Sequence, residues 1–149
     1  MQGKSDNLIL ADEFTSLEHA DFCGVPGYLV LKVKTRAESF GDLSTGQAQR
    51  LGGLLASASS AVETVTRADR VYCLSFCEVN RKLHFHLFPR TESMLAAYQE
   101  ATGTAGQPVD GPALFAWARK AYPAGAAVPA GTPKVADIVI ALREMLDPA

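Results

Sequence analysis

One short segment, His84–Arg90, constrains most strongly what this chain can fold into. It reads His-Phe-His-Leu-Phe-Pro-Arg and holds two of the chain's three histidines. Side chains alternate between the two faces of a strand, so residues two apart point the same way. The set expected to face the core is Leu83, Phe85 and Leu87. The set expected on the opposite face is Lys82, His84, His86 and Phe88.

The polar face of this strand indicates a site for chemistry. A face that only had to be soluble would carry Thr, Lys or Glu, whereas two neighbouring imidazoles supply donors, acceptors and a nucleophile near neutral pH. Pro89 cannot donate to a sheet ladder, so we expect the strand to end there. Arg90 is then expected at the rim of the histidine face, where an anion could reach it.

The rest of the chain predicts an α+β fold, in which an antiparallel sheet is packed on one side by one long helix. Strands are expected at residues 8–10, 28–33 and 71–76, with an irregular stretch at 18–22. The turn at 78–81 predicts an antiparallel hairpin with the histidine strand. The long helix opens at residues 43–47 with a capping-box pattern of Ser44 and Gln47. Further C-terminal helices are expected at 91–98, at 112–121 and from Thr132-Pro133 onward.

Composition limits the functional classes. The 149 residues suit one domain over 1–149, with a core at about 8–90 and a variable helical extension at 91–149. The net charge of -2 and the lack of a Lys/Arg stripe argue against nucleic-acid binding. There is no apolar signal core and no membrane-length stretch, so no membrane association is expected. Three cysteines without a CxxC motif predict no disulfide framework and a cytoplasmic location.

Residues 83–90 resemble the motif of the histidine-triad (HIT) family, in which histidines alternate with apolar residues and Pro-Arg often follows. Pro26–Leu31 resembles the glycine-led central strand of that family, and Asp42–Ser44 resembles its loop-to-helix junction. The resemblance covers roughly residues 8–90. It implies a HIT-like fold and a homodimer, in which the long helix packs against its copy and Gly52-Gly53 lies at the two-fold contact.

The resemblance also implies roles for the histidines. Aligned on Pro89-Arg90, His84 matches the middle histidine, which in the family attacks the α-phosphate of a nucleotide, and His86 matches the last. Lys82 stands where the family has its first histidine. The Gly-Gln-Ser-type loop is absent, and no asparagine occupies the preceding strand. The residues left for that position are Ser75, Cys77 and Glu78.

These features together predict a hydrolase or transferase that acts on a nucleoside phosphoramidate or a (di)nucleoside polyphosphate. His84 is the expected nucleophile and His86 orients the phosphate, while Lys82 and Arg90 bind it. No cofactor and no metal are required. The base is expected in an apolar pocket formed by the first strands and the long helix.

Two other readings of the same residues stay open. One is a catalytically weakened nucleotide-binding module of the same fold, motivated by Lys82 and the missing loop. The other is a metal-binding protein, in which Glu92 or Cys73 would complete a site with His84 and His86.

Overall fold

In the computed structural model, residues 6–147 are described, and they form one five-stranded sheet with four α-helices. The strands are β1 (Leu8–Ala11), β2 (Thr15–His19), β3 (Leu29–Val33), β4 (Arg70–Leu74) and β5 (His84–Arg90). The helices are α1 (Thr45–Thr66), α2 (Glu92–Thr102), α3 (Gly111–Ala121) and α4 (Val135–Leu146), with a short 3-10 helix at Phe40–Asp42. The predicted α+β class is confirmed. No helix in this part of the chain has the length and apolar character needed to cross a bilayer.

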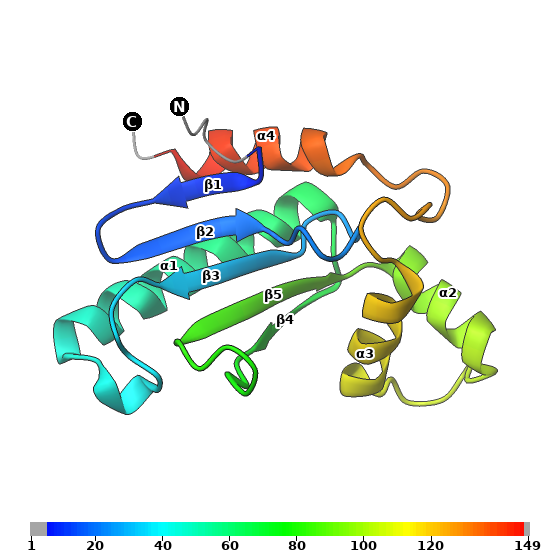
Figure 1. Cartoon of the computed structure of the whole chain (residues 1–149). Helices are drawn as coiled ribbons and strands as arrows, with labels where there is room; N and C mark the ends of the chain where they lie inside the picture. Colours follow the sequence, from blue (N-terminus) through cyan, green and yellow to red (C-terminus); the bar gives the residue numbers. More distant parts are fainter. Residues whose placement is uncertain (1–5, 148–149) are drawn as a thin grey trace.

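The sheet is antiparallel throughout, with the strand order β1-β2-β3-β5-β4 (Figure 1). The predicted hairpin between β4 and β5 is confirmed, although its connection is longer than expected and spans residues 75–83. The histidine strand therefore lies between the central strand β3 and the edge strand β4.

The strand β2 corrects the expectation of an irregular stretch beginning at residue 18. Thr15, Leu17 and His19 alternate inward along it and are buried, while Ser16 and Glu18 are partly exposed. This is the period of a half-buried strand. Because a threonine and a histidine occupy inward positions, the period cannot be recognised when only apolar residues are counted.

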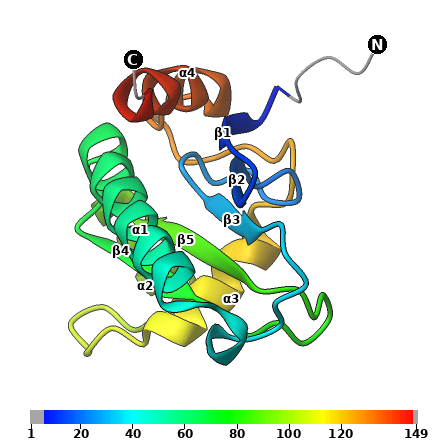
Figure 2. The same ribbon diagram turned by 90° about the vertical axis from the view of Figure 1, so that its left-hand side faces the viewer.

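One face of the sheet is covered by α1 and α4, which lie side by side on it (Figure 2). As expected, Leu83, Phe85 and Leu87 belong to the core on this face and are at most 3% exposed. The other core members from the helices are Leu51, Ala58, Ala61, Val62, Ile138, Val139 and Leu142. The long helix and the last helix thus together bury one side of the histidine strand.

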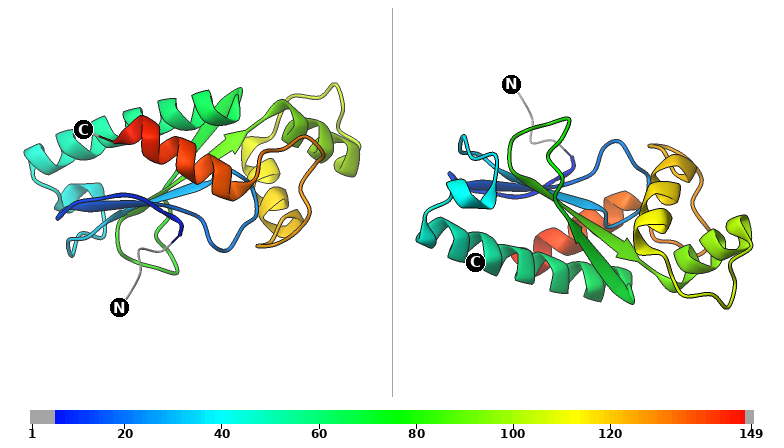
Figure 3. Two further views of the ribbon diagram at one scale, coloured as in Figure 1. Left: turned by 90° about the horizontal axis from the view of Figure 1, so that it is seen from above. Right: turned by 90° about the horizontal axis from the view of Figure 1, so that it is seen from below.

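On the opposite face, the described helices cover only one end, where α2 and α3 pack (Figure 3). They enclose a second hydrophobic cluster, whose members from the sheet and the adjoining loop are Ala20, Cys23, Val25, Tyr28, Val30 and Phe88. From the helices, Met94, Tyr98, Leu114, Phe115 and Ala118 complete it. This second cluster leaves the part of β5 around His84 and His86 uncovered by helices.

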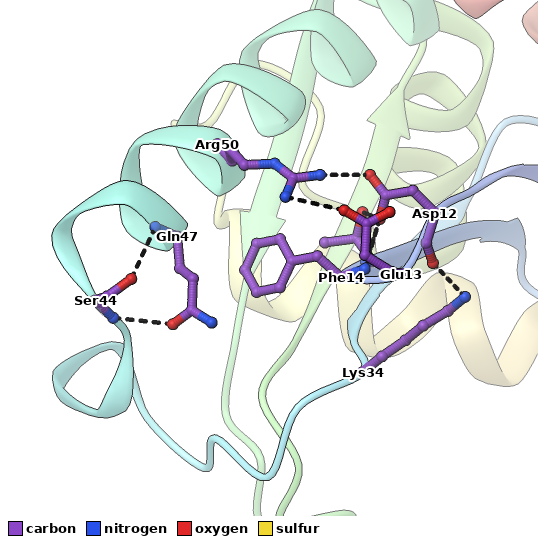
Figure 4. Close-up of polar contacts among 8 residues, drawn as sticks. Asp12, Glu13, Phe14, Lys34, Ser44, Gln47 and Arg50 are labelled. Carbon is purple, nitrogen blue, oxygen red and sulfur yellow. Dashed lines mark hydrogen bonds and ion pairs between the residues drawn. The ribbon is translucent and has the colours of Figure 1, made fainter.

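The start of α1 is fixed by local hydrogen bonds. The Ser44 hydroxyl accepts from the Gln47 amide N–H at 3.2 Å, and the Gln47 side chain accepts from the Ser44 N–H at 3.0 Å (Figure 4). The predicted capping box is therefore present. One turn further on, Arg50 bridges to Asp12 and Glu13 in the β1–β2 connection, and so ties the helix to the sheet.

Two predicted element ends that depend on a proline are wrong. The strand β5 continues through Pro89 to Arg90, because β3 pairs with it no further than Leu87, so the missing proline N–H falls beyond the β3 ladder. The helix α4 begins at Val135 with Lys134 as its N-cap, which leaves Pro133 outside the helix. Both differences concern the ends of the elements and leave their order unchanged.

Candidate functional site

His84 is held in a single tautomer by the backbone of the connection that precedes its strand. Its ring Nδ1 lies 2.7 Å from the carbonyl oxygen of Lys82. A carbonyl only accepts, so Nδ1 carries the proton and donates it. The other ring nitrogen, Nε2, is therefore left with a lone pair. This arrangement is the one that a neutral imidazole needs to act as a nucleophile.

His86 is held by Tyr28 of the adjoining turn. Its Nδ1 lies 2.6 Å from the Tyr28 hydroxyl, and its ring centre lies 5.3 Å from that of His84. Burial raises the pKa of Tyr28, so the hydroxyl keeps its proton. Among the described residues Nδ1 is the one hydrogen-bond partner of this hydroxyl, so the hydroxyl donates to Nδ1. Burial, with smaller contributions from His84 and Arg119, lowers the pKa of His86 to about 4. His86 is therefore neutral near pH 7, and its Nε2–H is a hydrogen-bond donor.

Three adjoining cavities on the open sheet face share Asn80 and His84. The largest, about 380 Å³, lies between the β4–β5 connection and α3, and reaches Phe22 and Arg119. The second, about 200 Å³, extends toward β2, where it is lined by Glu18 and Asp21. The third, about 230 Å³, is bordered by Lys82 and by residues of β2 and β3. His86 lines the first two.

Arg119 of α3 reaches this face over two aromatic rings. Its guanidinium carbon lies 5.3 Å from the ring centre of Phe22 and 5.4 Å from that of Phe115. The ring of His86 lies 6.3 Å from Phe22 and 6.2 Å from Phe115, in edge-to-face arrangements. The rings therefore fix the position of a cation next to the histidines.

The structure separates the two predicted phosphate-binding cations. Lys82 borders the cavity shared with His84, and its side chain is exposed. The expected position of Arg90 is wrong: Arg90 is only 8% exposed, and its Nη2 donates to Asp69 at 2.8 Å. It lies six residues along the strand from His84, which is about 20 Å at the usual rise. Its burial and its pairing with Asp69 therefore remove Arg90 from the histidine face.

Ser75 and Cys77 lie against the backbone of His84. The Ser75 hydroxyl donates to the His84 carbonyl oxygen at 2.7 Å, and the Cys77 Sγ lies 3.6 Å from His84 Nδ1. Nδ1 carries a proton and donates a hydrogen bond to the Lys82 carbonyl oxygen. It therefore has no lone pair with which to deprotonate the thiol. The contact therefore does not form the thiol–imidazole pair of a cysteine nucleophile.

The third histidine, His19, has a structural role and is not part of the candidate site. It is 1% exposed, its Nδ1 bonds to the Ala20 carbonyl at 2.9 Å, and its Nε2 accepts from the Gly27 N–H at 2.9 Å. Both ring nitrogens are satisfied, so His19 joins the end of β2 to the turn that leads to Tyr28.

Sequence reasoning missed the residues that reach the histidines from other segments. Asn80 accepts from the Lys82 N–H through its side-chain oxygen at 3.1 Å and borders all three cavities. Phe22, Tyr28 and Arg119 come from a loop, a turn and a helix outside the hairpin. The short polar turn containing Asn80 was the available signal for that residue, whereas no local pattern indicates the other three.

No group of three or more His, Cys, Asp or Glu side chains within residues 6–147 is arranged to hold a metal ion. The two candidates for completing such a site with His84 and His86 were Glu92 and Cys73. Neither Glu92 nor Cys73 lines a cavity that contains either histidine.

The order of the strands, the helix-covered face and the open face with alternating histidines define the histidine-triad fold. Solved structures show this fold across nearly the whole described chain. A histidine triad protein from Bradyrhizobium japonicum superposes with a TM-score of 0.59 and 19% identity, covering 93% of this chain and 88% of that one. A hypothetical histidine triad nucleotide-binding protein from Sulfolobus tokodaii gives a TM-score of 0.59 and 15% identity, covering 93% and 82%.

A third similar structure is a HIT-like protein involved in cell-cycle regulation from Bartonella henselae, with a TM-score of 0.57 and 15% identity. The alignment covers 94% of this chain and 86% of that one, so it includes the helical C-terminal region. No protein-family model matches the chain, and no curated protein sequence matches it. The expected HIT-like fold is confirmed.

Proposed function

We propose that this protein is a nucleotide hydrolase or transferase in which His84 attacks the α-phosphate. The observation that carries this proposal is the bond from His84 Nδ1 to the Lys82 carbonyl, which leaves the Nε2 lone pair available. The fold supports it, because one similar structure is described as a histidine triad nucleotide-binding protein.

The reaction follows from the positions of the two histidines. In the first step, the Nε2 lone pair of His84 forms a bond to the α-phosphorus. The bond to the leaving group breaks, and its electron pair goes with the leaving atom. In the second step, a water oxygen bonds to phosphorus, the P–N pair returns to His84, and the water proton passes to solvent. A transferase uses another acceptor in place of water.

His86 stabilises the negative charge on the phosphoryl oxygens in the transition state. Its neutral ring donates through Nε2–H to a phosphate oxygen, and Tyr28 keeps that tautomer. Lys82, at the border of an adjoining cavity, adds positive charge from the other side. The buried Arg90 takes no part in this proposal, because its guanidinium is paired with Asp69.

The nucleoside is best accommodated toward β2. The cavity there places Glu18 and Asp21 next to both histidines, and carboxylates accept hydrogen bonds from ribose hydroxyls. The expected base pocket against the long helix is wrong, because α1 packs on the other face of the sheet. The base would instead lie on the histidine face, against Val30 and Phe22.

The proposal includes a homodimer. Among the described residues β4 pairs only with β5, so its other edge is open there, next to an exposed side of α1. Nothing within residues 6–147 lies within 4 Å of a Cβ built on Gly52 or Gly53. That surface would allow the close approach of a second copy of the helix.

The test is intact-mass spectrometry after brief mixing with adenosine phosphoramidate or diadenosine tetraphosphate. We expect product and a transient nucleotidyl adduct in the wild type, and neither in His84→Asn. Ser93→Asn, on the surface of α2 and outside the three cavities, is the matched control and should behave as the wild type. Nucleotide binding without product from either substrate would refute turnover and support the weakened binding module.

A further inference from the structure

We infer that Arg119 binds the leaving group, and that it makes the site selective for leaving groups that depart as phosphate anions. This inference rests on the proposed function and adds a specificity-determining residue from α3. Three observations carry it: the surroundings of the guanidinium, the distribution of charge along the site, and the kind of group that faces the leaving atom.

The guanidinium of Arg119 is oriented but not neutralised. It lies over Phe22 and Phe115 at 5.3 and 5.4 Å. Within residues 6–147 it forms no ion pair, in contrast to Arg50, Arg81 and Arg90. Glu78 lines the same cavity, yet it is not within ion-pair distance of Arg119. A fixed guanidinium without a carboxylate partner is arranged for an incoming oxyanion.

Charge along the site gives the substrate a direction. Glu18 and Asp21 line the cavity on the β2 side of the histidines together with Lys32, which forms an ion pair with Glu18 and leaves Asp21 unpaired among the described residues. Arg119 lines the cavity on the α3 side with Glu78, to which it is not paired. His84 and His86 line both. A phosphate chain is repelled by the unpaired carboxylate of Asp21 and attracted by the unpaired guanidinium of Arg119, whereas ribose hydroxyls suit the carboxylates. The leaving group therefore points toward α3.

The groups facing the leaving atom supply charge and hydrogen bonds, but not a transferable proton. His86 is neutral near pH 7, because its pKa is lowered to about 4, and a guanidinium holds its proton firmly. An amine must gain a proton before it can leave, whereas a phosphate oxygen leaves as an anion with the bonding electron pair. The arrangement thus assists a polyphosphate more than a phosphoramidate.

The space beyond Arg119 fits a longer chain. A separate depression, about 460 Å³, shares Phe22 and Arg119 with the histidine cavity and is also lined by Ala116 and Lys120. Arg119 thus stands between the cavity of the histidines and this second depression. A leaving group with several phosphates can pass over Arg119 and remain in contact with protein.

The test compares two substrates that share the adenylyl group. We would measure kcat/KM for diadenosine tetraphosphate and for adenosine phosphoramidate with the wild type and Arg119→Gln. The expected result is a loss of about tenfold to a hundredfold for the tetraphosphate and less than threefold for the phosphoramidate. Arg119→Lys, which keeps the charge, should recover part of the loss. Lys120→Gln, the neighbouring cation outside the histidine cavity, should lose clearly less than Arg119→Gln.

The outcomes separate the two proposals. Equal losses on both substrates, no loss on either, or an equal loss in Lys120→Gln would overturn the role of Arg119 and leave the role of His84 intact. A wild type that consumes neither substrate would overturn the proposed function. In that case calorimetry still tests Arg119: Arg119→Gln should weaken the binding of the tetraphosphate more than that of AMP, and equal weakening would overturn the inference.

Discussion

Tyr28 and His86 illustrate how a single buried hydrogen bond can set the chemistry of a residue. The hydroxyl, 2.6 Å from Nδ1, directs the remaining N–H of His86 toward the cavity. The same burial that orients the ring keeps it neutral. A charged imidazolium at this place would donate from both nitrogens and would lose its hydrogen bond from Tyr28. The chemistry of the site is therefore linked to its packing.

This link predicts a pH dependence of stability. The pKa of His86 is lowered from 6.5 to about 4, so between these pH values the unfolded chain binds a proton that the folded chain does not. The free energy of unfolding should therefore be constant above pH 6.5 for this group. It should fall as the pH falls toward 4, by at most about 1.4 kcal/mol per pH unit.

Urea unfolding of the wild type and His86→Gln from pH 4 to 8 measures this effect. We expect the variant to show a shallower loss of stability below pH 6.5. His19, whose pKa is also lowered by burial, is unchanged in both proteins, so the difference between the two slopes belongs to His86. Parallel curves would show that His86 is protonated as easily in the folded chain as in the unfolded one.

At the scale of single residues, the sequence could predict that His84 and His86 share one face, because side chains along a strand alternate with a period of two. It could not predict Phe22, Tyr28 or Arg119, because their approach to the histidines depends on how α3 packs over the second hydrophobic cluster. It also could not predict that Arg90 is buried, because its pairing with Asp69, before β4, is a tertiary contact that no local pattern indicates.

Among the elements, the turn between β2 and β3 carries the strictest local requirement. Gly27 has a φ of +90°, and a Cβ at this position would lie 2.5 Å from the Thr66 Cγ2 at the end of α1. Its N–H also donates to His19. The turn therefore holds β2, β3 and α1 at fixed distances, directly before Tyr28.

We expect Gly27→Ala to lower the free energy of unfolding by about 1–3 kcal/mol, because it adds backbone strain and a steric clash. Denaturant titration measures the change. Gly46→Ala is the control, since a Cβ at Gly46 has no neighbour within 4 Å among the described residues. That control should be neutral or slightly stabilising. Equal changes in the free energy of unfolding for the two variants would show that the steric clash with Thr66 does not destabilise the fold.

Elements with a clear period were predicted well, and those without one were not. The alternation at the start of β5 follows from Leu83, Phe85 and Leu87, and it is confirmed at those positions. The strand β2 was missed because Thr15 and His19 occupy buried positions. The helix α2 extends to Thr102, beyond the expected end near residue 98, because Gly103 closes it in a left-handed conformation.

For the whole molecule, the proposed dimer is the main prediction. Sedimentation of the wild type should give the mass of two chains, and Gly53→Arg should shift it toward one chain, because a large side chain blocks close helix contact. Gly46→Arg, at the start of the same helix, is the control and should remain dimeric. A wild type that sediments as a single chain would show that the open edge of β4 is not an interface.

The two faces of β5 also limit how this protein can change in length. Leu83, Phe85 and Leu87 fill one core, and His84 and His86 lie between them on the other face. Inserting or deleting one codon in this strand would exchange the faces, which would bury imidazoles and expose the core residues. A single insertion or deletion would therefore abolish both the fold and the chemistry of the site. Length variation among natural variants is therefore expected in the 75–83 connection and absent from β5.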